Sequence, residues 1–175
     1  MELLFDAHLA LSLNAIEWNR DLRRPVNEIR DIERGIPSHL KGHGCGVVAF
    51  PEMRKGGIGI CVATQLAGCM KPRSFVATWE SPSQAWAMTQ CQLAWYREME
   101  AHGEMVQIRD LVGLEQHLEL WKDPSAAGVE NAAIGYILSL EGADSLVTID
   151  YLAKAWEEGL RALGPSHYGV GRYAM

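Results

Sequence analysis

The chain has 175 residues, of which 48% are hydrophobic and 22% are charged, an ordinary composition for a folded globular protein. This composition excludes a disordered chain, and the absence of a linker or internal repeat predicts a single domain over residues 1–175. The net charge of −6 argues against a nucleic-acid partner, because binding to a phosphate backbone usually needs a basic surface.

The amino terminus lacks the features of a secretory signal. Residues 1–6 have neither a basic segment nor a long apolar core, and no stretch approaches the roughly 18 apolar residues of a membrane span. We therefore expect no membrane contact and a cytoplasmic location. The cysteines include no Cys-x-x-Cys pair and are expected to be free thiols, mostly buried. They are Cys45, Cys61, Cys69 and Cys91.

Short apolar runs alternate with stretches of helical periodicity along the whole chain. The predicted elements, in chain order, are a strand over 3–11, a helix over 26–34, a strand over 58–63, helices over 84–102 and 111–121, a strand over 132–141, a helix over 149–158 and a strand over 160–163. The run 47–50 competes for the second strand, with a break at Pro51. The short apolar piece 105–108 receives no assignment.

Several residues set the expected boundaries of these helices. Pro25 suits the start of the first helix and Gly35 its end, while Ser83 and Thr148 are the expected N-caps of two later helices. The alternation of strands and helices predicts an α/β fold with a parallel sheet and right-handed crossovers, either doubly wound or a barrel. A nucleotide site is not expected, because Gly57-Ile58-Gly59 lacks the third glycine of a dinucleotide loop.

Three polar residues lie at or near the ends of predicted strands. His8 follows the apolar residues 3–5, Glu141 ends the run 132–141, and His167 comes shortly after the strand 160–163. Barrel enzymes carry their catalytic residues at the carboxyl ends of strands, and two imidazoles with a carboxylate are typical ligands of zinc. These residues are therefore candidates for a metal-dependent hydrolase site.

Four segments in order along the chain resemble the membrane (renal-type) dipeptidase family of zinc peptidases. They are FDAH at 5–8, NAIEWNRDL at 14–22, LSLEGA at 138–143 and GLRALGPSHYG at 159–169. The resemblance implies a (β/α)8 TIM-type barrel, of which this chain would be the amino-terminal half, with about four parallel strands and flanking helices. It also implies two zinc ions and hydrolysis of dipeptides by a metal-bridging hydroxide.

The same resemblance implies a role for each candidate residue. His8 would be a metal ligand, Glu141 would bridge both zinc ions as a catalytic and metal-binding carboxylate, and His167 would contact the substrate and stabilise the oxyanion. The family has an aspartate where this chain has Ala10. In a strand, residues 8 and 10 point to the same face, so an aspartate there would reach the same ion, whereas alanine cannot. Asp6 is expected at most to support a ligand.

The chain is also shorter than the roughly 250 residues of an eight-stranded barrel. By resemblance, the histidines of the second metal, an acid-base aspartate and a substrate-binding arginine belong to a missing carboxyl-terminal half. We expect substoichiometric zinc, and either self-association or completion by that half, because unpaired strand edges invite pairing.

Three functions remain open at this point. The first is a zinc dipeptidase that is incomplete as an isolated chain, and the second is a metal-poor relative that binds a small peptide-like ligand without cleaving it. The third is a structural or assembly module. Without the family resemblance, His8 would be read as a buried histidine bonded to Asp6. The pair His39 and His43 has helical ligand spacing, but the glycines around His43 favour a loop.

Overall fold

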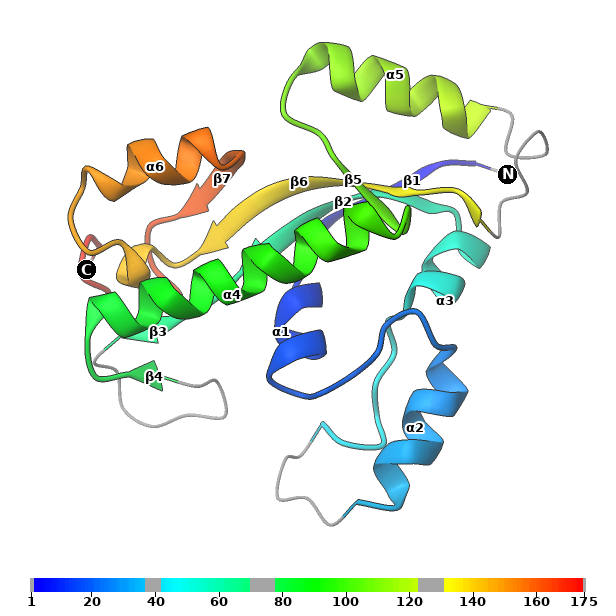
Figure 1. The fold of residues 1–175 in the computed structure, drawn as a ribbon, viewed down its shortest axis with the longest axis horizontal. Coiled ribbons are helices and arrows are strands. Elements are labelled where there is room, and N and C mark those ends of the chain that lie inside the picture. Colours follow the sequence, from blue (N-terminus) through cyan, green and yellow to red (C-terminus); the bar gives the residue numbers. More distant parts are fainter. Residues whose placement is uncertain (1, 37–41, 70–77, 123–130, 175) are drawn as a thin grey trace.

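A computed structural model describes residues 2–36, 42–69, 78–122 and 131–174 of the chain. Its centre is a five-stranded sheet in which every strand pair is parallel. The strands are β1 (Leu4–Leu9), β2 (Ile58–Gln65), β5 (Met105–Gln107), β6 (Ile134–Glu141) and β7 (Leu160–Gly164). The order is β1-β2-β6, and both β5 and β7 pair with β6 (Figure 1). A small parallel pair joins β3 (Gly68–Cys69) to β4 (Thr78–Trp79).

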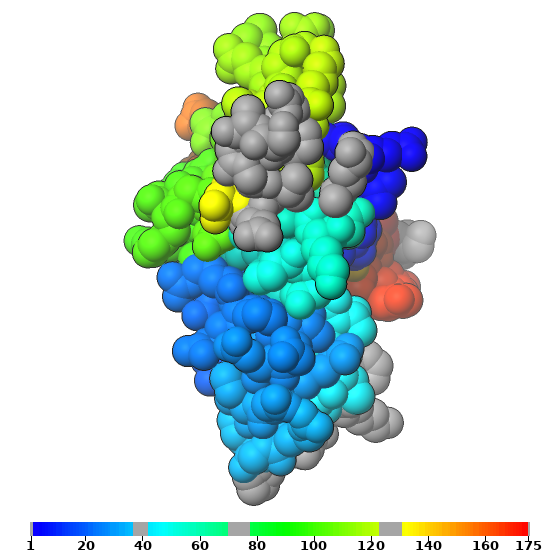
Figure 2. Space-filling model, turned by 90° about the vertical axis from the view of Figure 1, so that its right-hand side faces the viewer, coloured from blue at the N-terminus to red at the C-terminus, as the bar shows by residue number. Residues whose placement is uncertain are grey.

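Helices pack on both sides of this sheet. They are α1 (Leu11–Ile16), α2 (Val26–Arg34), α3 (Phe50–Lys55), α4 (Pro82–Ala101), α5 (Leu111–Lys122), the 3₁₀ helix η2 (Ala143–Ser145) and α6 (Tyr151–Glu157). The long helix α4 runs along one face of the sheet and α5 lies on the other side (Figure 1). In Figure 2, α2 and α5 lie at opposite ends of the visible face. Within the described residues, no helix is both long enough and apolar enough to cross a bilayer.

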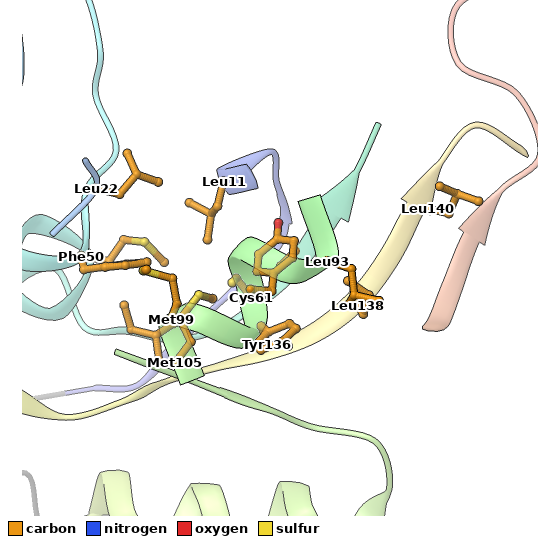
Figure 3. Packing of buried hydrophobic residues seen from close by; sticks show 14 of the residues in the cluster. Leu11, Leu22, Phe50, Cys61, Leu93, Met99, Met105, Tyr136, Leu138 and Leu140 are labelled. Atoms are coloured by element: carbon orange, nitrogen blue, oxygen red, sulfur yellow. The ribbon is translucent and has the colours of Figure 1, made fainter. Parts of the chain in front are cut away.

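The main hydrophobic core lies between the sheet and α4. Strand β6 is its centre, because six of its eight residues are buried and its neighbour β2 pairs with it over six consecutive positions. The ring of Tyr136 on β6 stacks on Tyr96 of α4, with 5.1 Å between the ring centroids. Leu93, Cys61 and Leu138 belong to the same buried cluster as this pair and are labelled with Tyr136 in Figure 3. A strand buried on both faces reads as a continuous apolar run, which explains why β6 was predictable.

Close approach of α5 depends on two glycines in the sheet. A Cβ built on Gly135 would lie 2.6 Å from Ile108 and 2.7 Å from Nε2 of His117, and one built on Gly59 would lie 2.7 Å from the Trp121 ring. His117 is 3% exposed, and its Nε2 lies 2.8 Å from the carbonyl oxygen of Gly59. Larger side chains at positions 59 and 135 would therefore push α5 away.

The first predicted strand is shorter than expected. It ends at Leu9, and α1 begins at Leu11, whereas the sequence predicted a strand through residue 11. Leu11 and Leu13 are buried in the core, so burial against other elements favours a helix over the extended conformation. The competing run 47–50 is not a strand, since Phe50 starts α3 with Pro51 in its first turn, where proline fits a helix.

Other boundaries also differ from the expectations. Helix α4 is capped by Ser81 instead of Ser83, because the Ser81 hydroxyl accepts the backbone N–H of Gln84 at 3.3 Å. Helix α6 begins at Tyr151, three residues after the expected cap Thr148. The unassigned piece 105–108 contains β5, whose three residues are too few to show a period.

Helix α2 has the predicted bounds. Val26, Ile29 and Glu33 are its buried residues, whereas Ile32 is 51% exposed. The cysteine prediction is half right. All four thiols are free, with Cys61 and Cys69 buried and the other two exposed.

Candidate functional site

The parallel topology brings the three candidate residues together. His8 lies in β1, Glu141 is the last residue of β6, and His167 follows the end of β7. Strand β7 pairs directly with β6, with Glu141 opposite Gly164. Because all strands run in one direction, their carboxyl ends meet at the same edge of the sheet.

The carboxylate of Glu141 is at the centre of the cluster. Its Oε2 lies 3.3 Å from Nε2 of His8, and its Oε1 lies 3.1 Å from Nε2 of His167. The side chains of Glu141 and His167 are each 20% exposed, whereas that of His8 is 57% exposed. Each carboxylate oxygen thus faces a different imidazole, and the group remains open to solvent on the His8 side.

Gly142 allows the chain to turn sharply after Glu141. Its φ of +97° lies in the region that favours glycine, and a Cβ at this position would lie 3.1 Å from Cβ of His167. The Gly142 N–H donates to the carbonyl oxygen of Gly164 at 3.0 Å. The Glu-Gly sequence therefore permits the close approach of His167 to Glu141.

Two expectations about β1 need correction. The argument that residues 8 and 10 share a strand face fails, because β1 ends at Leu9 and its pairing with β2 is irregular between Asp6 and Leu9. Ala10 lies beyond the strand, directly before α1. His8 is not a buried histidine bonded to Asp6 through its ring. It is exposed, and its backbone N–H donates to Oδ1 of Asp6 at 2.9 Å.

The described residues do not form a complete zinc site. No group of three or more His, Cys, Asp or Glu side chains suited to a metal ion occurs among residues 2–36, 42–69, 78–122 and 131–174. A catalytic zinc usually has three protein ligands and a water molecule. His8 and Glu141 offer two donors of suitable chemistry, and Ala10 offers none.

Only one member of the second histidine pair lies in the part of the chain that the structure describes. His39 lies outside the described residues. His43 lies in a loop, as the glycines predicted, and both of its ring nitrogens are shielded from solvent without a hydrogen-bond partner. His43 lines a cavity of about 300 Å³ together with Trp18 and the ion pair Arg20–Glu33.

Sequence reasoning missed Asp144, which lies three residues after Glu141. This aspartate is 2% exposed, and its Oδ1 accepts the backbone N–H of Arg172 at 2.8 Å. No motif indicated it, because its partner is a main-chain group 28 positions away. Tyr168, beside the candidate site, also has an unusual conformation, with a φ of +46° and its ring edge-on to His167 at 4.5 Å.

Comparisons with known proteins bear on the fold of the chain. No family model matches the sequence, and no curated protein matches it. Among solved structures, the chain is similar to a crystal structure of the dipeptidase AC, described as a metallopeptidase of family M19, with 23% sequence identity and a TM-score of 0.60. The match covers 94% of this chain and 42% of that structure. The α/β arrangement of parallel strands and flanking helices is therefore that of part of a TIM-barrel dipeptidase, as the sequence predicted.

Proposed function

We propose that this chain contributes one part of the active site of a zinc-dependent dipeptidase. In this proposal His8 and Glu141 are metal ligands, and His167 binds the dipeptide substrate. The contacts of Glu141 support it most directly, because its two oxygens lie 3.3 Å and 3.1 Å from the imidazoles of His8 and His167. The structural similarity to a metallopeptidase described as a dipeptidase agrees with this chemistry.

The chain alone is expected to be catalytically incomplete. When bound, zinc supplies a Lewis acid and lowers the pKa of its water, but the described residues offer only two of the usual three protein ligands. No catalytic step is therefore assigned to this chain by itself. The remaining ligands, including those of a second zinc ion, would come from another part of a longer protein or from a companion chain.

An unpaired sheet edge supports the idea that other residues complete the site. Strand β1 pairs only with β2 in the described structure, and Leu4 and Phe5 on β1 are 48% and 55% exposed. A strand with an open edge and exposed apolar side chains is a ready template for another strand. We propose that either a carboxyl-terminal half or a second copy of the chain pairs there.

A second candidate function is a metal-poor relative that binds a peptide-like ligand without cleaving it. Ala10 and the lack of a three-donor group among the described residues favour this alternative. In that case Glu141 and the two histidines would bind the charged or polar groups of the ligand by hydrogen bonds. The two candidates differ in their dependence on zinc.

Dipeptide hydrolysis with and without added zinc tests the proposed function. The unmixed chain should cleave no dipeptide above a metal-free control, because the described residues lack a complete metal site. The acid-base aspartate expected in the carboxyl-terminal half would also be absent, and general acid-base catalysis is usually worth about 10²- to 10⁴-fold. Mixing with the separately expressed carboxyl-terminal part of a related dipeptidase should restore zinc-dependent cleavage, and Glu141→Gln should abolish it.

The controls for this assay distinguish the two parts of the proposal. His102→Ala serves as a matched variant, because His102 is an exposed histidine on the surface beside Glu98 and lies outside the cluster. Robust zinc-dependent cleavage by the unmixed chain would contradict its incompleteness. Cleavage by the mixture that survives Glu141→Gln would contradict the role of Glu141.

A further inference from the structure

The segment that follows β7 folds back over the turn that follows β6. We define the strap as residues 165–173, which carry His167. Directly after Glu141, residues 142–146 form the turn that contains η2. The two segments lie at neighbouring strand ends, since β7 pairs with β6 through Glu141 and Gly164. The strap is therefore the part of the chain that decides where His167 lies relative to Glu141.

The strap is attached to the turn at both of its ends. At the near end, the Gly142 N–H donates to the Gly164 carbonyl at 3.0 Å, and the Ala143 N–H donates to the Pro165 carbonyl at 3.4 Å. At the far end, the backbone N–H of Arg172 donates to Oδ1 of Asp144 at 2.8 Å. His167 lies between these two attachments.

The far attachment is centred on a buried side chain. Asp144 is 2% exposed, and a Cβ built on Gly171 would lie only 2.9 Å from its Oδ1. Arg172 also donates through Nη1 to the carbonyl of Leu146 at 2.8 Å, and the Tyr173 hydroxyl donates to the same carbonyl at 2.9 Å. Of these contacts, only that of Asp144 uses a side chain of the turn. A buried carboxylate that accepts an N–H makes a charge-assisted bond, the stronger class.

We infer that Asp144 is a positioning residue that holds His167 against Glu141 through the strap. It acts at a distance along the chain, by fixing Arg172 to the turn that directly follows Glu141. The strap has little other support on its outer side, because Tyr168 and Val170 are 90% and 69% exposed. The inference rests on the proposed function, because that proposal places His167 in the substrate site.

The adjacent residue Ser145 provides a matched control. It belongs to the same turn and is 0% exposed, but its hydroxyl has no hydrogen-bond partner. Replacing it with alanine removes a buried oxygen of the turn without removing an attachment of the strap. A role of Asp144 in packing the turn alone would make Asp144→Ala and Ser145→Ala behave alike.

The test uses nuclear magnetic resonance on the isotope-labelled 175-residue chain, without zinc or substrate. The nuclear Overhauser effect between the α protons of Gly142 and the β protons of His167 reports their close approach. Asp144→Ala should reduce its intensity at least threefold, while effects within the β2–β6 core stay unchanged. In Asp144→Asn most of the intensity should remain, because the amide oxygen still accepts the Arg172 N–H. Ser145→Ala should leave it unchanged.

Gly171→Ala keeps the test decisive if Asp144→Ala does not fold. The added methyl group would crowd Oδ1 of Asp144 from the partly exposed strap, so the contact between Gly142 and His167 should weaken with the core intact. Full intensity in Asp144→Ala or Gly171→Ala would overturn the inference, as would an equal loss in Ser145→Ala. Because the measurement needs no metal, failure of zinc binding and failure of this inference are separate results.

Discussion

We predict that the free energy of unfolding depends strongly on the buried ion pair between Arg20 and Glu33. Their side chains are 3% and 5% exposed, and Nε of Arg20 lies 2.5 Å from Oε1 of Glu33. Arg20 also donates to Oδ1 of Asn14 and to the carbonyl of Gly42, while the Gly44 N–H donates to Glu33. The pair thus ties α2 to the chain after α1.

Glu33→Ala should lower the free energy of unfolding by about 3 kcal/mol, because removing one partner leaves a buried charge uncompensated. We take the low end of the usual range of roughly 3–5 kcal/mol because both residues line the 300 Å³ cavity, through which water can approach Arg20. Glu28→Ala, on the same helix, is the matched control. Glu28 and Arg24 are each about half exposed and 3.6 Å apart, so the loss should be about 0.5 kcal/mol or less.

Urea denaturation followed by circular dichroism measures both differences. Equal losses for Glu33→Ala and Glu28→Ala would refute the reasoning, since the pair of Glu33 is buried and hydrogen-bonded to further groups, whereas the pair of Glu28 is half exposed. The pH dependence provides a second check. Burial alone would raise the pKa of Glu33, but the hydrogen bonds from Arg20 and Gly44 outweigh it and lower the pKa. Stability from this group should therefore be present above the ordinary pKa of a glutamate, and it should be lost as the pH falls from there through the lowered pKa.

Three further predictions concern the sheet. Gly135→Ala should cost about 2 kcal/mol in thermal or urea unfolding because its Cβ would overlap Ile108 and His117, whereas Gly113→Ala on α5 should cost nothing; equal effects would contradict the close packing. Burial lowers the pKa of His117, although its hydrogen bond to the Gly59 carbonyl opposes this effect. The free energy of unfolding should therefore fall as the pH drops below about 6.5, because the unfolded histidine then takes up a proton before the folded one does. His117→Gln should flatten that slope, and an unchanged slope would contradict it. The chain should self-associate through its open β1 edge, and sedimentation that gives a concentration-independent monomer of 19.4 kDa would refute this.

The elements that could be predicted are those whose sequence pattern agrees with their surroundings. Strand β6 is a continuous apolar run buried on both faces, and α2 is bracketed by Pro25 and Gly35, so its bounds agree with the prediction. By contrast, the apolar run after β1 changes from strand to helix at Leu11 without a proline or glycine to mark the change. Burial against other elements decides that boundary, and local sequence carries little signal of it.

The candidate site was predictable only in part. Parallel strands must bring their carboxyl ends together, so the proximity of His8, Glu141 and His167 follows once the strand order is known. The attachment through Asp144 was not predictable, because it joins a side chain to a backbone N–H that the sequence does not distinguish. The burial of Glu33 was missed for a similar reason, since its partner Arg20 lies 13 positions earlier in an irregular segment.

Calorimetric titration of zinc into the chain tests the central claim, that His8 and Glu141 form part of a metal site, most directly. We predict weak binding, with substoichiometric zinc after dialysis, because two protein ligands are one fewer than a catalytic zinc usually has. His8→Ala and Glu141→Gln should each weaken binding further, whereas His102→Ala should not. Zinc binding that is unchanged in both His8→Ala and Glu141→Gln would contradict the account.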